Sequence, residues 1–247
     1  MTGPLLSVRG LSRSFGGLKA LDAVDLDLHE GEILGVIGPN GAGKTTLFSL
    51  IAGSLAPSAG EVLLQGHPVG GRAAHRLVRG GIVRTHQIVR PFANLTVLEN
   101  VTVAALHGGR RADTSARHRA PEVLAFAGLS SRAEQMPSAL TLAGRKRLEL
   151  ARALATLPRV LLLDEVIAGV NPTEAMELAG LIRRIRDELG TSIIMIEHVM
   201  PAVMSLSDRV LVLDHGKKIA EGTPAEVVRN PLVVEAYLGT SAEAATP

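Results

Sequence analysis

The chain has 247 residues, of which 46% are apolar and 2% aromatic, and its formal net charge is +2 at pH 7. This length and composition predict a globular core of ordinary size, as one large domain or as one domain with a subdomain. The lack of cysteine excludes disulfides, cysteine-based metal sites and a thiol nucleophile, while near-balanced charge and few aromatic rings argue against a nucleic-acid partner.

The start of the chain carries neither the basic segment nor the long apolar segment of a signal peptide. No uninterrupted apolar run approaches the roughly 18 residues that would suggest a membrane-spanning helix. We therefore expect a cytoplasmic location, and we expect any association with a membrane to be peripheral.

Residues 5–31 alternate short apolar segments with turn residues, which predicts antiparallel strands. Phe15 precedes Gly16 and Gly17 in a predicted turn. Its ring could stack on an adenine base, or it could equally pack beneath a hairpin, and the local sequence leaves both alternatives open.

The apolar run at 32–37 predicts a buried strand, and residues 46–52 have the apolar spacing of a helix that stops at Gly53. The segment between them fits the pattern G-x-x-x-x-G-K-[ST] and comprises Gly38, Pro39, Asn40, Gly41, Ala42, Gly43, Lys44 and Thr45, followed by Thr46. In such a loop, glycines let consecutive N–H groups surround an anion at a helix N-terminus. Lys44 would meet the β- and γ-phosphates of a nucleotide, and Thr45 would hold Mg²⁺.

Coincidence is the alternative to this interpretation of the loop. At average amino-acid usage, the bare pattern would arise by chance in roughly one per cent of chains of this length. Its position between a predicted strand and a predicted helix favours nucleotide binding.

From about residue 70 to 150, helical patterns interrupted by prolines such as Pro121 replace the strand-like runs. They predict a helical subdomain at approximately residues 88–150. A short strand-like segment that ends at Gln87 precedes it. The run 110–119 carries four arginines and one aspartate, which favours a solvated loop over contact with lipid headgroups.

The apolar run 160–163 is followed by Asp164 and Glu165, which predicts a buried strand that delivers two carboxylates at its carboxyl end. Asp164 could help to hold Mg²⁺, and Glu165 could orient or deprotonate a water molecule that attacks the γ-phosphorus. A buried strand that ends in acids also occurs for purely structural reasons. Its combination with the phosphate loop favours the catalytic interpretation.

Residues 171–174 predict a capped helix start, and residues 191–198 predict a further buried strand that ends in His198. This histidine should emerge at the same sheet edge as Glu165. An isolated histidine is usually inert, but one at this edge can donate to a γ-phosphate oxygen. The small, polar tail 241–247 is expected to be disordered.

Taken together, these segments resemble the ATP-binding subunits of ABC transporters over nearly the whole chain. In that resemblance residues 38–45 match Walker A, Gln87 the Q-loop glutamine, 160–165 Walker B with its catalytic glutamate, 168–171 the D-loop and His198 the switch histidine. The signature segment is matched by Leu140 with Thr141, Leu142, Ala143 and Gly144, and Phe15 matches the adenine-stacking aromatic.

The resemblance implies an α/β fold in one domain over 1–247. We expect an ABC-type P-loop NTPase core with a mixed, largely parallel sheet, an antiparallel β subdomain and a helical subdomain. It also implies ATP and Mg²⁺ as cofactors, with Thr45, Gln87 and Asp164 at the metal and Lys44, Gln87, Glu165 and His198 in catalysis. Two subunits would dimerise head to tail, each ATP lying between Walker A of one and the signature segment of the other.

The implied partners are transmembrane permease subunits, a second ATP-binding subunit, either identical or paralogous, and indirectly a periplasmic or extracellular solute-binding protein. Nucleic acid is not expected. The implied location is peripheral, at the cytoplasmic face of the membrane. Segments 91–100, 147–155 and 235–239 look most like those of branched-chain amino acid-type importers. Exporters of lipid or lipopolysaccharide are the nearest alternative, followed by ABC ATPases outside transport and by a nucleotide-dependent scaffold without turnover.

Several positions depart from the family pattern. Ala143 and Gly144 replace the second glycine and the glutamine of LSGGQ, while Thr141 can substitute for the serine. Val166 replaces the proline after Walker B, and Asn171 replaces the common D-loop aspartate. None of these changes removes a catalytic group, so the sequence predicts an active ATPase in which ATP clamping could be weaker.

Overall fold

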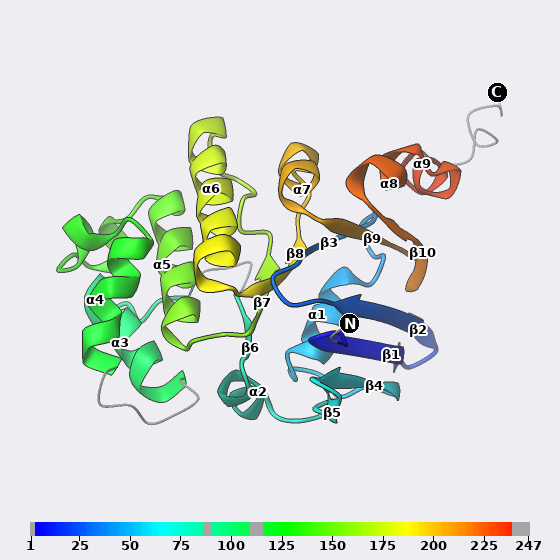
Figure 1. Ribbon diagram of the computed structural model, residues 1–247, viewed down its shortest axis with the longest axis horizontal. Coiled ribbons are helices and arrows are strands. Elements are labelled where there is room, and N and C mark those ends of the chain that lie inside the picture. Colours follow the sequence, from blue (N-terminus) through cyan, green and yellow to red (C-terminus); the bar gives the residue numbers. More distant parts are fainter. Residues whose placement is uncertain (1–2, 86–89, 109–115, 239–247) are drawn as a thin grey trace.

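The computed structural model describes residues 3–85, 90–108 and 116–238, and it contains two β-sheets with helices around them (Figure 1). The predicted roles of Gln87 and the predicted disorder of 241–247 lie outside the described residues. Among the helices described, none is both long and apolar enough to span a membrane.

The smaller sheet is antiparallel and has the strand order β2-β1-β4-β5. Its two long strands arise from residues 5–31, as the alternating apolar pattern predicts, and Leu6 and Val8 of the first strand are fully buried. The strands are β1 (Leu6–Phe15), β2 (Leu18–Leu28), β4 (Ala59–Leu64) and β5 (His67–Pro68).

The larger sheet has the order β10-β9-β3-β8-β7-β6, in which β10 is antiparallel to β9 and the other pairs are parallel. Every residue of β3, β7 and β8 is buried, which explains why these strands are continuous apolar runs in the sequence. Parallel pairing brings their carboxyl ends to one edge, where ligands bind in open α/β sheets. The strands are β3 (Ile33–Ile37), β6 (Ile82–Arg84), β7 (Val160–Asp164), β8 (Ser192–Ile196), β9 (Arg209–Asp214) and β10 (Lys217–Gly222).

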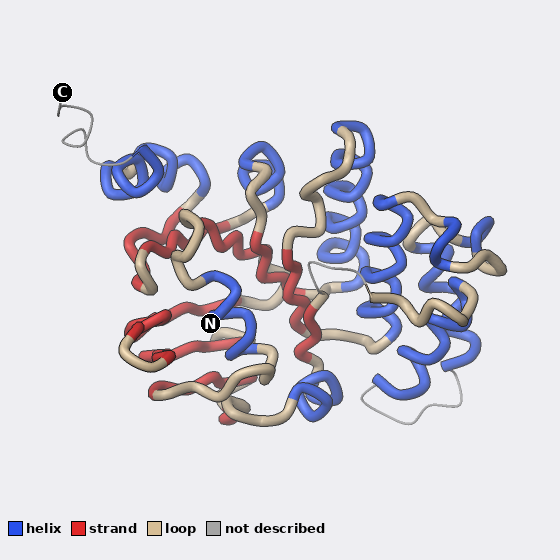
Figure 2. Tube along the Cα trace, turned by 180° about the vertical axis from the view of Figure 1, so that it is seen from behind, coloured by secondary structure: helices blue, strands red, loops and turns tan. Residues whose placement is uncertain are grey.

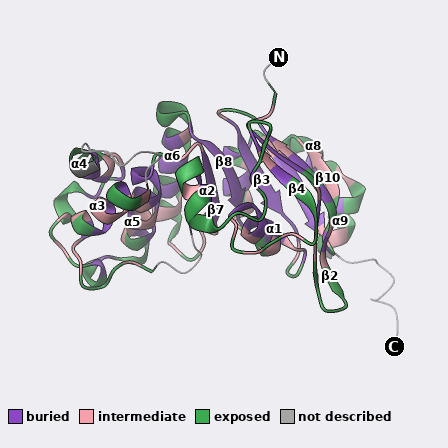
Figure 3. Ribbon diagram, turned by 90° about the horizontal axis from the view of Figure 1, so that it is seen from below, coloured by how far each residue is buried: buried purple, intermediate pink, exposed green. Residues whose placement is uncertain are grey.

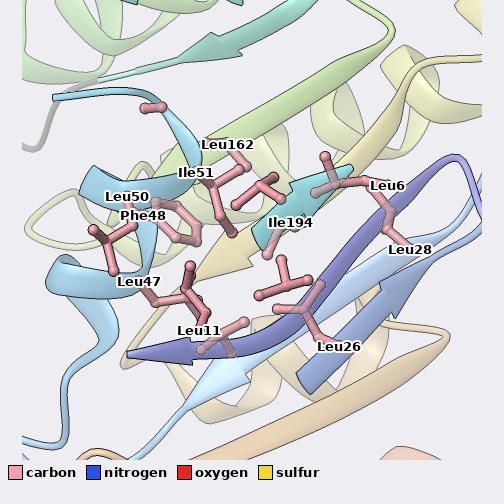
Figure 4. Close-up of a cluster of buried hydrophobic side chains, with 14 of the residues drawn as sticks. Leu6, Leu11, Leu26, Leu28, Leu47, Phe48, Leu50, Ile51, Leu162 and Ile194 are labelled. Atoms are coloured by element: carbon pink, nitrogen blue, oxygen red, sulfur yellow. The ribbon is translucent and has the colours of Figure 1, made fainter. Parts of the chain in front are cut away.

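Helix α1 (Lys44–Ile51) lies between the two sheets, as the view from behind in Figure 2 shows. Its side chains Leu47 and Phe48 are fully buried in a cluster that also contains Leu11 of β1 and Leu162 of β7 (Figure 4). Burial of one such side chain contributes about 1.5–3 kcal/mol. This packing fixes the beginning of α1 beside the carboxyl end of β3.

The opposite face of the larger sheet is covered by α5 (Leu142–Ala155), α6 (Pro172–Leu189) and α7 (Met200–Leu206). Side chains of β7 alternate between the two faces, since Leu161 and Leu163 pack against these helices while Leu162 packs against α1. Figure 3 shows the sheet as a buried layer with exposed residues on the outer sides of the helices. Three further helices are α2 (Ala74–Gly80), α8 (Pro224–Arg229) and α9 (Pro231–Leu238).

A separate apolar cluster joins α3 (Val97–Gly108), α4 (Ala116–Phe126) and α5 (Leu142–Ala155) at one end of the molecule (Figure 1). Short 3₁₀ turns at Ser130–Arg132 and Pro137–Ala139 connect α4 to α5. Helix α5 belongs to both clusters, since Leu148 packs in this one and Leu150 packs against the sheet. Residues 116–119, which we expected in a loop, form the first turn of α4, and Pro121 lies within that helix.

Candidate active site

The phosphate-loop segment runs from the end of β3 to the first residue of α1. Two of its glycines are required by their surroundings. A Cβ on Gly38 would lie 2.0 Å from the carbonyl oxygen of Leu213, and a Cβ on Gly43 would lie 2.6 Å from that of Ala20. Gly43 is also the N-cap of α1 and has no side chain to occupy the first N–H groups of the helix. These groups can therefore bind an anion.

Lys44 is buried inside this loop. Its Nζ donates hydrogen bonds to the carbonyl oxygens of Gly38 at 2.7 Å and Pro39 at 2.8 Å. Burial lowers the pKa of the Lys44 ammonium, while the carboxylate of Glu165 acts in the opposite direction. The loop thus surrounds the Lys44 ammonium with backbone groups, and this ammonium interacts electrostatically with the carboxylate of Glu165.

A cleft of about 320 Å³ lies over the loop at the carboxyl edge of the larger sheet. The predicted residues that line it are Asn40, Gly41, Ala42, Gly43, Lys44, Thr45, Thr46, Glu165 and His198. The lining residues that the sequence did not single out are Leu18, Lys19, Ala20, His215 and Gly216. They come from the start of β2 and from the turn between β9 and β10. The local sequence of these two segments does not indicate that they lie beside the phosphate loop.

Glu165 and His198 leave neighbouring parallel strands at this edge. His198 Nε2 lies 2.6 Å from Glu165 Oε1. Glu165 adopts a left-handed backbone conformation with φ of 51°, and its N–H donates to the carbonyl oxygen of Ile196 at 2.9 Å. The arrangement places a carboxylate and an imidazole together above the phosphate loop, where they can exchange or orient a proton.

Asp164 is buried at the end of β7 and is paired with Arg84, which the sequence did not single out. Arg84 Nη2 donates to Asp164 Oδ2 at 2.6 Å, and its Nη1 donates to Ser49 Oγ of α1 at 3.0 Å. Asp164 does not line the cleft. The guanidinium therefore ties the last residue of β7 to β6 and α1.

Glu197 precedes His198 and is fully buried. Burial raises the pKa of its carboxyl to about 7, although the N–H of Ile167 donates to Oε1 at 2.6 Å and favours the ionised form. This carboxyl lies behind the cleft, because it contacts the loop that follows Glu165.

The signature segment lies at the start of α5, apart from the cleft, which none of its residues lines. Thr141 is the N-cap, with its hydroxyl oxygen accepting from the N–H of Gly144 at 3.1 Å. Leu142 is 48% exposed, whereas Ala143 is buried. Within one chain, this segment does not complete the cleft.

Phe15 also lies outside the residues that line the cleft, although Leu18 of the same hairpin lines it. The Phe15 side chain is 44% exposed, and the guanidinium carbon of Arg13 lies 4.8 Å from its ring centroid. One face of the ring is therefore covered by a cation.

A family model described as "ABC transporter" matches residues 21–168, and one described as "Branched-chain amino acid ATP-binding cassette transporter" matches residues 217–243. The chain is 43% identical to the high-affinity branched-chain amino acid transport ATP-binding protein LivG of Escherichia coli K12, covering 97% of this chain and 99% of LivG. It is 40% identical to the BraF protein of Pseudomonas aeruginosa with the same description and the same coverage.

Among solved structures, a nucleotide-free ATP-binding cassette from an ABC transporter superposes with a TM-score of 0.88 at 30% identity, covering 96% of this chain and 99% of that one. The ADP conformation of the cassette MJ1267 gives the same TM-score, identity and coverage. A dimeric cassette, MJ0796, bound to ADP and Pi has a TM-score of 0.78 at 25% identity, covering 89% of this chain and 98% of that one.

Proposed function

Because this chain belongs to the ATP-binding subunits of ABC transporters, whose activity is ATP hydrolysis, we propose that it powers the import of branched-chain amino acids. The observation that carries this proposal is the similarity to LivG over nearly the full length of both chains. The second family model, over residues 217–243, supports the same subfamily and favours an importer over a lipid exporter.

In the proposed reaction, the phosphates of ATP bind the N–H groups at the start of α1, and Lys44 turns from the loop carbonyls to the β- and γ-phosphates. Glu165 accepts a proton from the attacking water as it approaches the γ-phosphorus. His198 Nε2 lies 2.6 Å from Glu165 Oε1, where it orients that carboxylate, and when ATP is bound the imidazole N–H donates instead to a γ-phosphate oxygen. Gln87 would complete this set, as expected from the sequence.

The donor groups that Mg²⁺ would use differ in position, since Thr45 lines the cleft whereas Asp164 lies outside its lining and is paired with Arg84. The hydroxyl of Thr45 and the carboxylate of Asp164 are oxygen donors, which Mg²⁺ prefers, and Mg²⁺ bound with a nucleotide uses few protein ligands because phosphates and waters supply the rest. Among the described residues, no cluster of three histidine or acidic side chains could hold a metal ion. The ion would neutralise phosphate charge in the reaction.

The second half of each ATP site comes from another subunit in this proposal. The signature segment does not line the cleft of its own chain, and Thr141 and Leu142 are exposed at the beginning of α5. Head-to-tail pairing would bring this segment to the partner's nucleotide, and the cassette MJ0796 forms a dimer. We propose that permease subunits hold such a pair at the cytoplasmic face of the membrane and receive solute from a binding protein.

Solute uptake tests the proposal. In a strain that lacks this chain, the wild-type protein should restore uptake of radiolabelled leucine, whereas Lys44→Ala should not, because it removes the charge placed against the phosphates. Lys218→Ala, on exposed β10 and outside the cleft, is the matched control and should restore uptake. Normal leucine uptake without the chain would contradict branched-chain amino acid import, and restoration by Lys44→Ala would contradict the role of the loop.

A further inference from the structure

Lys146 is a buried cation behind the ATP cleft, which it does not line. It lies on α5 just after the signature segment, and 6% of its surface is exposed. Its Nζ donates to the carbonyl oxygen of Glu165 at 2.8 Å and to that of Ala168 at 2.7 Å. One side chain thus joins the helix that begins with the signature segment to the loop that begins with Glu165.

The same loop is held from the opposite side by β8 and the residue after it. The N–H of Glu165 donates to the carbonyl oxygen of Ile196 at 2.9 Å, and the N–H of Ile167 donates to Glu197 Oε1 at 2.6 Å. Residues 165–168 are therefore fixed between two elements. Lys146 supplies the bonds from α5, and β8 with Glu197 supplies the others.

The conformation of Glu165 requires such support. Its φ of 51° lies in the left-handed region, which a non-glycine residue adopts only when surrounding contacts hold it there. Its N–H donates to the carbonyl oxygen of Ile196, and its carbonyl oxygen accepts from Lys146 Nζ. These two bonds hold the peptide groups on both sides of its Cα. The resulting turn brings its carboxylate to His198.

Packing alone does not explain a lysine at position 146. Burial lowers the pKa of its ammonium, while Glu197 and Glu165 favour the charged form. Desolvation of a buried cation is costly, and a methionine of similar shape would avoid that cost. What the lysine adds is the pair of hydrogen bonds to the backbone of the Glu165 loop.

We propose that Lys146 is a positioning residue for ATP hydrolysis, which holds the backbone of Glu165 and couples it to the signature helix. The inference rests on the proposed role of Glu165 as the base. When the signature segment at the start of α5 closes on a partner's nucleotide, Lys146 passes the displacement of that helix to Glu165 in its own cleft.

Lys146→Met tests this role, because it keeps the shape of the side chain and removes both donors. In the transporter with its permease subunits, we expect kcat to fall about 10²-fold, the loss associated with a displacement of roughly 1 Å in a reacting group. The KM and Kd for ATP should stay within about two-fold, since the ATP-binding groups are untouched. Lys146→Arg keeps a charged donor and should recover part of kcat.

Arg147→Met is the matched control on the same helix. The Arg147 guanidinium donates to the carbonyl oxygen of Ala127 at 3.1 Å and pairs with Glu177 at 2.7 Å, so its loss disturbs α5 without touching the Glu165 loop. We expect its kcat to stay near the wild-type value. A fall equal to that of Lys146→Met would assign the effect to the stability of α5 and overturn the inference. If Lys146→Met does not fold, Lys146→Gln, which keeps a neutral donor, takes its place.

A double-mutant cycle separates positioning from a general structural role. If Lys146 acts through Glu165, then Lys146→Met should slow the Glu165→Gln variant by less than about three-fold, because the group it positions is already gone. An equal fall in both backgrounds would overturn the inference. A wild-type rate in Glu165→Gln itself would instead refute the proposed role of Glu165 as the base. A slow Glu165→Gln beside a wild-type rate in Lys146→Met would refute only the role of Lys146.

Discussion

The imidazole Nε2 of His198 lies 2.6 Å from Oε1 of Glu165, across the edge where β8 and β7 end side by side. This contact gives one carboxylate at the cleft a defined orientation. The imidazole of His198 also supplies a hydrogen-bond donor beside the position proposed for the γ-phosphate.

Removal of that donor should slow chemistry more than it weakens binding. For His198→Ala we expect kcat to fall by about 10²–10³-fold, the loss typical of one preorganised donor to a developing charge, with the Kd for ATP nearly unchanged. Single-turnover hydrolysis with labelled ATP measures this rate directly. His67→Ala, an exposed histidine on β5, is the control, and an unaltered rate in His198→Ala would contradict the role of the imidazole.

Phe15 is predicted to stack on the adenine ring, on the ring face that Arg13 does not cover. Phe15→Leu should therefore raise the Kd for ATP by about 2–10-fold, as expected from aromatic stacking energies of roughly 0.5–1.5 kcal/mol. Inorganic triphosphate has no base, so its affinity should not change. Calorimetric titration with both ligands makes the comparison, and an equal loss for triphosphate would indicate that Phe15 only supports the hairpin.

Much of this fold follows from local patterns. Fully buried strands such as β7 are continuous apolar runs, and the capping box expected at Asn171 is present, with its side chain accepting from the N–H of Glu174 at 2.9 Å. The sequence also shows that Glu165 and His198 each follow a predicted buried strand. Parallel pairing alone brings Glu165 and His198 to one edge.

Contacts between distant side chains could not be predicted in the same way. Arg84 and Asp164 are 80 residues apart, and Lys146 bonds to backbone carbonyls rather than to a complementary side chain. Neither contact leaves a periodic or spacing signal, because each depends on how β6 and α5 pack against β7. The positions of Lys19 and His215 at the cleft could not be predicted either, because they depend on how β2 and the turn between β9 and β10 pack beside the phosphate loop.

The buried carboxyl of Glu197 should make stability depend on pH. Its pKa is raised from 4.5 to about 7, so the folded state favours the protonated form. The stabilisation is complete below about pH 4.5 and is lost as the pH rises through about 7, with an upper bound of about 3.5 kcal/mol at roughly 1.4 kcal/mol per pKa unit. Urea unfolding at several pH values between 5 and 8 measures this change in the free energy of unfolding.

Glu197→Gln supplies the comparison, because the amide oxygen can still accept from Ile167 while the group no longer titrates. Relative to the wild-type protein, this variant should gain stability as the pH rises from 5 to 8. Parallel stability curves for the two proteins would show that Glu197 has an ordinary pKa.

Membrane association should depend on the permease subunits rather than on lipid. Residues 116–119 of the arginine-rich run form the first turn of α4, where Arg119 is buried, and residues 110–115 lie outside the described residues. Cell fractionation with and without co-expressed permeases should recover the protein in the membrane fraction only when they are present. Equal binding to protein-free vesicles of anionic lipid would identify the run as a lipid anchor.

We propose that Glu165 is the base in an ATPase that works as a dimer. Glu165→Gln keeps the shape of the side chain and removes the base, so hydrolysis should slow by about 10²–10⁴-fold while ATP and Mg²⁺ still bind. The ATP-bound pair should then accumulate, even though Ala143 and Gly144 depart from the family's signature segment.

The decisive measurement is sedimentation of Glu165→Gln, with any partner ATPase present, together with its rate of ATP hydrolysis. We predict a dimer with Mg-ATP that is absent with ADP, and a turnover slowed at least about 10²-fold. Wild-type turnover would contradict the role of Glu165 as the base, and bound ATP without a dimer when the partner is present would contradict the head-to-tail pairing.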